Sequence, residues 1–421
     1  MQELAADVAL AGGIANEERL VCTECGQHAA IRDMPSTCPR CDGILDARFP
    51  DKPETVSDEA GNPGIWHWRR FLPDCAPVYR VTLGEGRTPL LTCARLGAEL
   101  GLETFWVKND AIMPTSSFKD RAIAVAISLA RQYGKRGVVL SSSGNAGASA
   151  AAYAARAGLP AVVLVPATAP RSKLTQILVH GARLVTVQGE TSDCCRLAAV
   201  AARRFGWVNL TTTYCNPYGV DGYATIAYEI AAMRPEVLLL PISCGPLLAG
   251  VMKGFTRMQA LGLIEHVPRP VAVQPAGCAP IVRAFTSGAR VTAWTPEHTI
   301  ASALNDTLAG YERDGDYTLA WLRRCGGTAV AVSDEAVVRA VCALAEREGL
   351  FVEPSAAVPV AAISNLVASG WLDRSQRVVA VATGHGLKDV PAAAIPDLPA
   401  PIEPTEAALS IVLDQVAVGP P

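Results

Sequence analysis

The chain has 421 residues, half of them hydrophobic, and a formal net charge of −3. This length and apolar content suffice for two ordinary cores and a small extra module. No basic run or basic stripe interleaved with aromatic residues is present, which argues against nucleic acid as the main partner.

The segments that would target a chain to a membrane or to secretion are also missing from the sequence. No apolar run is long enough to cross a bilayer, and the N-terminus MQELAADVALAGG lacks the basic start of a signal peptide. The 13 cysteines lie mostly among aliphatic segments, which fits a reducing compartment better than a disulfide-stapled secreted chain. We therefore expect a cytoplasmic protein that binds no membrane.

The N-terminal segment begins with a short helix predicted over residues 1–19 and continues into a cysteine-bearing module. Cys22 and Cys25 form one C-x-x-C pair, and Cys38 and Cys41 form a second pair after 12 intervening residues. This spacing is close to that of zinc ribbons, in which four thiolates hold one Zn²⁺ tetrahedrally. Four cysteines leave no open coordination position, so we expect a structural zinc. A pair of redox dithiols or a vestigial site is the alternative.

From about residue 65 to 390, continuous apolar runs alternate with alanine-rich segments of helical length. The runs are TFWVKN, GVVLSSS, AVVLVPA, RLVTVQG, VLLLPIS, PVAVQPA and RVVAVAT. Each is bounded by glycine, proline or polar residues, a pattern typical of parallel strands that are covered on both faces. The alternation predicts a doubly wound α/β architecture, whose ligands bind where strands lead into helices. A Pro- and Ala-rich tail follows, with one predicted helix around residues 406–416.

The first strand–helix loop with evident chemistry contains Lys119, one of only seven lysines in the chain. Ser116 or Ser117 is placed to cap the helix that Lys119 begins. The helix dipole and partial burial both lower the pKa of such a lysine, and a neutral amine is a nucleophile toward an aldehyde. The alternative is that Lys119, Asp120 and Arg121 form a solvated charged turn.

The second loop joins the run GVVLSSS to an alanine-rich helix through Ser142, Ser143, Gly144, Asn145, Ala146 and Gly147. Small residues let the backbone approach a ligand, and the free N–H groups at a helix start suit a carboxylate or a phosphate. The alternative is tight strand–helix packing, for which glycine and alanine are equally suited.

The third loop, Ser243-Cys244-Gly245-Pro246, follows the run VLLLPIS and also opens a helix. Its backbone N–H groups and the Ser243 hydroxyl predict a phosphate cradle. Pro246 removes one N–H, at a helix position where proline is well tolerated.

Together these loops match a known family. From about residue 82 to 389 the chain resembles fold-type II pyridoxal-phosphate enzymes, and specifically the threonine synthase group. The matching blocks, in order, are LGEGRTPL (83–90), PTSSFKDR (114–121), SSGNAGAS (142–149), ARAGLPAVVLVP (155–166), HTIASAL (298–304), VEPSAA (352–357) and ATGHGLKD (382–389).

The resemblance implies two doubly wound α/β domains, similar to the tryptophan synthase β subunit, beside a small N-terminal zinc ribbon. On this basis we expect an N-terminal segment over residues 1–50, a catalytic region over 51–390 and a tail over 391–421. The smaller catalytic domain, about residues 105–215, is expected as an insertion in the larger one. We also expect a homodimer.

The resemblance also implies roles for individual residues. Lys119 would hold pyridoxal 5′-phosphate as a Schiff base, Asn145 would bond the pyridine 3-hydroxyl and Thr383 would meet the pyridine nitrogen. The cofactor phosphate would lie on Ser243, Cys244, Gly245, Pro246 and Leu247, and the substrate α-carboxylate on Ser142, Ser143, Gly144, Ala146 and Gly147. Once displaced by the substrate amine, Lys119 would act as general base at Cα. A neutral hydroxyl at the ring nitrogen makes a weaker electron sink, which favours elimination and replacement over transamination.

Several departures from the family bear on the substrate. Threonine synthases usually carry basic residues where this chain has Gly219 and Ala224, in NPYGVDGYAT, and these cations help to hold the substrate phosphate. Ser243, Cys244 and Pro246 replace glycine or asparagine, and Asn305-Asp306 replaces a common basic residue. These changes favour a specialised-pathway paralogue acting on another small phospho- or hydroxy-amino acid.

We therefore predict a pyridoxal-phosphate-dependent lyase that is threonine synthase-like. Within enzymes, the alternatives are β-elimination of the serine or threonine dehydratase type and β-replacement that forms cysteate or diaminopropionate. From a different class, the alternative is a zinc-ribbon binding protein on an inactive scaffold.

Overall fold

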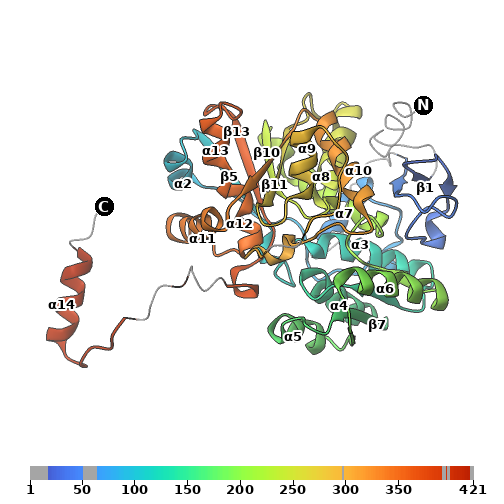
Figure 1. Ribbon diagram of the computed structural model, residues 1–421, viewed down its shortest axis with the longest axis horizontal. Helices are drawn as coiled ribbons and strands as arrows, with labels where there is room; N and C mark the ends of the chain where they lie inside the picture. The colour runs from blue at the N-terminus through green and yellow to red at the C-terminus, as the bar shows by residue number, and fades with distance from the viewer. Residues whose placement is uncertain (1–17, 51–63, 296–297, 391–394, 396–398, 418–421) are drawn as a thin grey trace.

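The computed structural model describes residues 18–50, 64–295, 298–390, 395 and 399–417. The helix predicted over residues 1–19 lies outside the described residues, except that Arg19 begins the first strand. The predicted tail helix is present as α14 (Glu406–Ala417), which lies away from the body of the molecule in Figure 1. Among the described residues, no helix is both long and apolar enough to span a membrane.

The N-terminal module is a small antiparallel sheet. Its strands are β1 (Arg19–Cys22), β2 (His28–Ala29) and β3 (Leu45–Arg48), in the order β2-β1-β3, with the short 3-10 helix η1 (Ile31–Asp33) following β2. Each cysteine pair lies in a tight turn, where Gly26 and Asp42 take positive φ angles of 71° and 60°.

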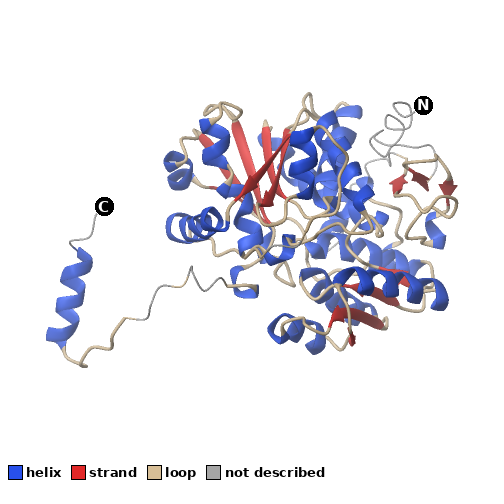
Figure 2. Cartoon of the chain, viewed as in Figure 1, coloured by secondary structure: helices blue, strands red, loops and turns tan. Residues whose placement is uncertain are grey.

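The larger sheet has six strands in the order β12-β11-β10-β13-β5-β4. They are β4 (Leu90–Thr92), β5 (Thr104–Asn109), β10 (Val237–Pro241), β11 (Arg269–Pro275), β12 (Thr328–Val332) and β13 (Arg377–Ala382). All neighbours pair in parallel except β4, which runs antiparallel to β5. The smaller sheet is parallel, with β6 (Val138–Ser141), β7 (Ala161–Pro166), β8 (Arg183–Val187) and β9 (Val208–Asn209) in the order β8-β7-β6-β9. Figure 2 shows the two sheets as separate groups of red strands.

Helices cover both faces of the larger sheet. Along β10, Leu238 and Leu240 pack with α7 (Pro217–Ile230), α8 (Pro246–Ala260), α9 (Pro280–Ser287) and α10 (Glu312–Arg324). The alternate residues Val237 and Leu239 pack with α2 (Ala94–Glu99), α11 (Asp334–Glu348), α12 (Pro354–Ala361) and α13 (Ile363–Ala368). Successive side chains of a strand point to opposite faces, so a continuous apolar run is what a sheet covered on both faces needs.

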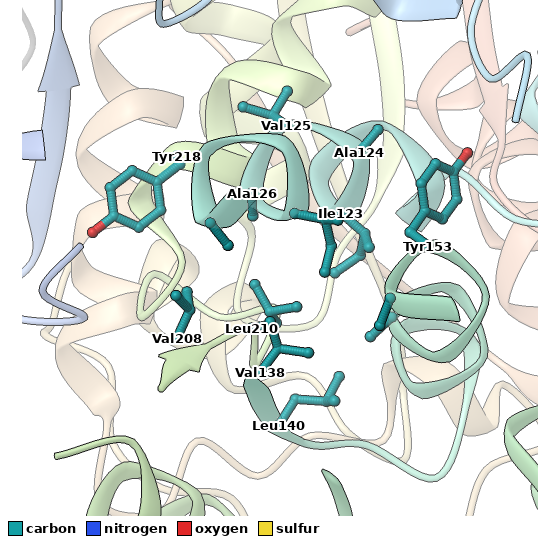
Figure 3. Close-up of a cluster of buried hydrophobic side chains, with 14 of the residues drawn as sticks. Ile123, Ala124, Val125, Ala126, Val138, Leu140, Tyr153, Val208, Leu210 and Tyr218 are labelled. Carbon is teal, nitrogen blue, oxygen red and sulfur yellow. The ribbon is translucent and has the colours of Figure 1, made fainter. Parts of the chain in front are cut away.

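The smaller sheet is covered in the same way. Val138 and Leu140 of β6 pack with α3 (Lys119–Gln132) and α4 (Asn145–Ala157), whereas Val139 packs with α6 (Thr191–Phe205). Helix α5 (Arg171–Val179) connects β7 to β8. Figure 3 shows side chains of α3 meeting those of β6, Tyr153 and Tyr218, so that α3 is buried on several sides.

The seven apolar runs all form strands, as predicted, and the α/β fold class is confirmed. Sequence reasoning missed β4, β9 and β12. β4 and β9 have only three and two residues, and β12 lies at the edge of the larger sheet with mostly half-buried side chains. The four-stranded sheet lies within residues 138–209, while β5 belongs to the six-stranded sheet. The division into residues 1–50, 51–390 and 391–421, with a smaller domain at about 105–215, stays a proposal.

The N-terminal ribbon is joined to helices α7 and α8 through a buried ion cluster. Lys253 of α8 donates to Asp46 of β3 at 2.7 Å and lies 3.0 Å from Asp221 of α7, and it also donates to the carbonyl oxygen of Ala47 at 2.6 Å. All three charged side chains are buried. Burial raises the pKa of Asp221 to about 6, although Lys253 opposes that rise. One ammonium group thus holds two carboxylates from different parts of the molecule.

Replacing Lys253 with Met should leave the buried Asp221 carboxylate without its ammonium partner, and Asp46 with only Arg48, 3.3 Å away, as a cation among the described residues. Removing one partner of a buried ion pair typically costs about 3–5 kcal/mol, so we expect Lys253→Met to lose that much of its free energy of unfolding. Urea denaturation checks this value. The control is Arg196→Ala, which breaks an exposed pair with Asp193 and should cost about 1 kcal/mol or less. Equal urea midpoints for Lys253→Met and the unmodified protein would contradict the assignment.

Candidate active site

Lys119 is the first residue of α3. The loop that precedes it is hydrogen-bonded to the loop that follows β13. The backbone N–H of Phe118 donates to the carbonyl oxygen of Thr383 at 2.9 Å, and the N–H of His385 donates to that of Ser116 at 3.1 Å. The expected cap by Ser116 or Ser117 is wrong. The helix has no side-chain N-cap; instead the Asp120 carboxylate accepts from the N–H of Thr115 at 2.8 Å and from its hydroxyl at 2.5 Å.

The alternative of a solvated charged turn is also wrong. Asp120 and Arg121 are completely buried. Arg121 donates to Asp110 at 2.7 and 2.9 Å and to Glu229 at 2.6 and 2.8 Å. The residues that flank Lys119 on its C-terminal side are therefore fixed structural groups, and only Lys119 itself faces open space.

The Lys119 amine lies on the wall of a cavity of about 1010 Å³. It donates to the Thr212 hydroxyl at 3.0 Å and lies 4.7 Å from the centre of the Phe118 ring. Burial lowers the pKa of Lys119 to about 8, against the opposing influence of Cys244, Asp306 and Glu353. About a tenth of such an amine is neutral at pH 7, far more than for an ordinary lysine.

The loop after β6 reaches the same cavity. Ser142, Ser143, Gly144, Asn145 and Ala146 line it, whereas Gly147 does not. A Cβ atom at Gly147 would lie 2.3 Å from the carbonyl oxygen of Ser142, so this glycine allows the loop to fold back onto its helix. Asn145 donates through Nδ2 to Glu353 at 2.9 Å, which leaves its second amide hydrogen and its oxygen for a ligand.

The loop after β10 forms another wall, with Ser243, Cys244, Gly245, Pro246 and Leu247 all lining the cavity. Gly245 has a φ of 106° and sets the turn into α8, whose first N–H groups have no partner within the helix. The Thr318 hydroxyl donates to the carbonyl oxygen of Cys244 at 2.5 Å and thereby fixes the loop. A helix N-terminus held in this way suits an anion.

Thr383 completes the predicted set. It is buried at the end of β13 and lines the cavity. Of the residues predicted for cofactor and substrate, the structure thus brings all but Gly147 to one cavity. The Sγ atoms of Cys22, Cys25, Cys38 and Cys41 form a separate group in the ribbon, all within 4.8 Å of one another.

Sequence reasoning gave no role to two residues that shape the cavity. Glu353 was quoted only as part of VEPSAA; burial raises its pKa to about 7, and the Lys388 ammonium opposes that rise. Thr212 fixes the Lys119 amine but lies in no matching block. The signal for Glu353 was its place in the matching block VEPSAA, directly before the proline that begins α12, whereas nothing in the local sequence singles out Thr212.

The prediction that Gly219 and Ala224 replace phosphate-binding cations of threonine synthases stays a prediction. Both are buried on α7 and neither lines the cavity. A Cβ atom at Gly219 would lie 3.0 Å from that of Ala122, and a Cβ atom at Gly254 of α8 would lie 3.2 Å from that of Ala224. Close contacts with α3 and α8 leave little room for larger side chains at these two positions. Two arginines that could supply a replacement charge, Arg171 and Arg183, do not line the cavity either.

Comparison with known proteins identifies the family. The model of the family described as "Pyridoxal-phosphate dependent enzyme" matches residues 81–384. The chain belongs to this family.

Curated relatives narrow the group. The chain is 35% identical over 380 residues to threonine synthase of Methanosarcina acetivorans, covering 88% of this chain and 92% of that protein. It is 37% identical over 360 residues to threonine synthase of Mycobacterium tuberculosis, covering 84% and 96%. Among solved structures, maize serine racemase superposes with a TM-score of 0.63 at 22% identity, covering 79% of this chain and 94% of that one. The prediction of a threonine synthase-like, pyridoxal-phosphate-dependent lyase is confirmed.

The residues of the cavity fit this cofactor. A buried amine with a lowered pKa, an amide, a hydroxyl and a helix N-terminus line one space, and the Ser141 hydroxyl on the same wall is buried without a hydrogen-bond partner among the described residues. When bound, pyridoxal phosphate supplies an electron sink for the pair of electrons left at the substrate Cα.

Gly245→Ala should weaken cofactor retention. The new Cβ would lie 2.2 Å from the Thr318 hydroxyl oxygen, in addition to the strain of a positive φ. We expect at least a tenfold weaker affinity for pyridoxal phosphate, measured by fluorescence titration of the cofactor-free protein. The control is Gly262→Ala, which has a φ of 69° but nothing within 4 Å of the added Cβ. Equal affinities for pyridoxal phosphate in the two variants would contradict the prediction, because they would show that the loop of residues 243–247 tolerates the added methyl group.

Proposed function

We propose that this lyase acts on the side chain of a small amino acid by elimination or replacement, with Lys119 as the residue that holds the cofactor. The observation that carries the proposal is the Lys119 amine, which has a pKa of about 8 and lines one cavity together with two strand–helix loops suited to anions.

The remaining roles follow from what each group can bind. Asn145 is assigned to the pyridine 3-hydroxyl and Thr383 to the ring nitrogen. The loop of residues 243–247 is assigned to the cofactor phosphate, because the N–H groups at the start of α8 and the Ser243 hydroxyl can donate to it. The loop of residues 142–146 is assigned to the substrate carboxylate in the same way, at the start of α4.

Lys119 would then move the proton at Cα. An amine with a pKa near the working pH is well suited to take up a proton and return it. The Thr212 hydroxyl, 3.0 Å away, would hold the displaced amine near the reacting carbon. Thr383 is neutral and favours expulsion of a leaving group over transamination. Dehydratase-type elimination and cysteate- or diaminopropionate-type replacement share these steps.

We propose a structural Zn²⁺ in the ribbon. A tetrahedral site with Zn–S distances of about 2.3 Å separates its sulfur atoms by about 3.8 Å. The Sγ atoms of Cys22 and Cys41 lie 3.5 Å apart, those of Cys25 and Cys38 3.7 Å, and those of Cys25 and Cys41 3.3 Å. The backbone N–H groups of Glu24 and Arg40 point to the Cys22 and Cys38 sulfurs, as expected around thiolates.

We further propose a homodimer in the cytoplasm. None of the 13 cysteines, all within the described residues, forms a disulfide, which supports a reducing compartment. The dimer rests on the resemblance alone, and the mass of the protein in solution tests it.

Lys119→Ala should remove both turnover and the visible absorbance of the bound cofactor, because Lys173 and Lys388, the other amines on the described cavity wall, are held by Asp389 and Gln176. Absorbance spectroscopy and product formation check this result. Lys135→Ala, which alters a lysine outside the cavity, should retain both. A Lys119→Ala protein that keeps the visible band would mean that another lysine holds the cofactor. An unmodified protein that never shows the band would favour the inactive scaffold.

The ribbon proposal predicts about one zinc per chain by elemental analysis. The double variant Cys22→Ser, Cys25→Ser should lose the metal and unfold at lower temperature, because Asp46 and its neighbours depend on the ribbon fold. Cys342→Ser, which alters a half-buried thiol outside the cysteine group, should retain the metal. Metal-free protein of full stability would refute a structural zinc.

A further inference from the structure

The cavity is poor in free positive charge. Apart from Lys119, its described lining contains only two cations, Lys173 and Lys388, and no arginine or histidine. Lys173 donates to Asp389 at 2.9 Å and to the Ser302 hydroxyl at 2.6 Å. Lys388 donates to the Thr115 carbonyl oxygen at 2.9 Å and to Gln176 at 2.6 Å. Both ammonium groups therefore already have acceptors within the protein.

Carboxylates are at least as numerous on the same wall, and three of them have evident structural roles. Glu190 caps α6, Glu353 accepts from Asn145, and Asp389 accepts from Lys173. The fourth, Asp306, has no cation bonded to it among the described residues. It lies in the segment between the 3-10 helix η6 (Ser302–Leu304) and α10 (Glu312–Arg324).

Asp306 is held firmly from one side. Its Oδ1 atom accepts from the Tyr311 hydroxyl at 2.5 Å and from the Leu308 N–H at 3.1 Å. Burial raises the pKa of Asp306, whereas the hydrogen bonds from Tyr311 and Leu308, the nearby Lys119 amine and the Cys244 thiol favour its charged form. Two hydrogen bonds on one oxygen orient the group and leave acceptor capacity on Oδ2, and Asp306 lines the same cavity as Lys119.

A fixed carboxylate in this place distinguishes substrates by charge. A phosphate dianion would meet Asp306 without an arginine to offset the repulsion, whereas a hydroxyl or an ammonium group would donate to it. We propose that Asp306 is a specificity-determining residue, which selects an unphosphorylated amino acid whose side chain carries a hydroxyl or ammonium group. This inference rests on the proposed function, and it names the substrate class of that site.

The test uses the holoenzyme and substrate pairs that differ only in the phosphoryl group. These are serine and O-phosphoserine, and homoserine and O-phosphohomoserine; 2,3-diaminopropionate represents the ammonium class. Dissociation constants come from the change in cofactor absorbance during titration, and kcat/KM from product formation. The unmodified protein should favour the unphosphorylated member of each pair at least tenfold in both measurements.

Asp306→Asn should reduce that preference by about tenfold or more, because it removes one negative charge while keeping the side-chain shape. The control is Asp414→Asn, the same substitution on the exposed face of α14, which should leave the preference unchanged. A greater loss of binding for 2,3-diaminopropionate than for serine would assign the ammonium class, and equal losses would assign the hydroxyl class.

Two results would overturn the inference. One is tighter binding of the phosphorylated members by the unmodified protein, and the other is an unchanged preference in Asp306→Asn. Neither affects the proposed function, which fails separately if ligands bind to the holoenzyme but no elimination or replacement product forms from any of them. In that case the titrations alone still decide the role of Asp306.

Discussion

The active site depends on the burial of Arg121, two residues after Lys119. Its guanidinium group is completely buried and bonds Asp110 and Glu229 through two hydrogen bonds each, while Lys108 lies 2.6 Å from Glu229. Burial alone would raise the pKa of Glu229, but Arg121 and Lys108 lower it to about 2. The two cations, Arg121 and Lys108, thus neutralise two carboxylates inside the protein. Removal of any one of these groups would leave a buried charge without a partner. This cluster ties the start of α3 to β5 and α7 and so sets the direction of Lys119.

Close helix contacts extend this constraint to the rest of the cavity. A Cβ atom at Gly222 of α7 would lie 2.3 Å from the Arg121 carbonyl oxygen, and one at Gly250 of α8 would lie 2.4 Å from that of Val220. Helices α3, α7 and α8 therefore pack with almost no side chain between them. The Lys119 amine and the start of α8 belong to one rigid stack, which also carries Lys253 and thereby the ribbon. The helices that position the active-site residues are therefore the same helices that hold the N-terminal ribbon.

Much of this arrangement could be predicted from the sequence, because its signals are local. The apolar runs are long enough to identify parallel strands, and the loops after them carry the residues that reach the cavity. Contacts between distant segments left no such signal. Asn145 and Glu353 are 208 residues apart, and Arg121 and Glu229 are 108 apart, so neither pair could be read from a single stretch. Gly219 and Ala224 show a related limit of sequence analysis. The motif NPYGVDGYAT locates both residues, but only the structure shows that they pack against neighbouring helices.

The most direct test of the account is to identify the lysine that carries the cofactor. Borohydride reduction of the holoenzyme fixes pyridoxal phosphate to the amine that holds it, and peptide mass spectrometry locates the modified residue. The account predicts a single modified peptide that contains Lys119. Modification of Lys108, Lys173 or Lys388 instead, or of no lysine at all, would contradict it.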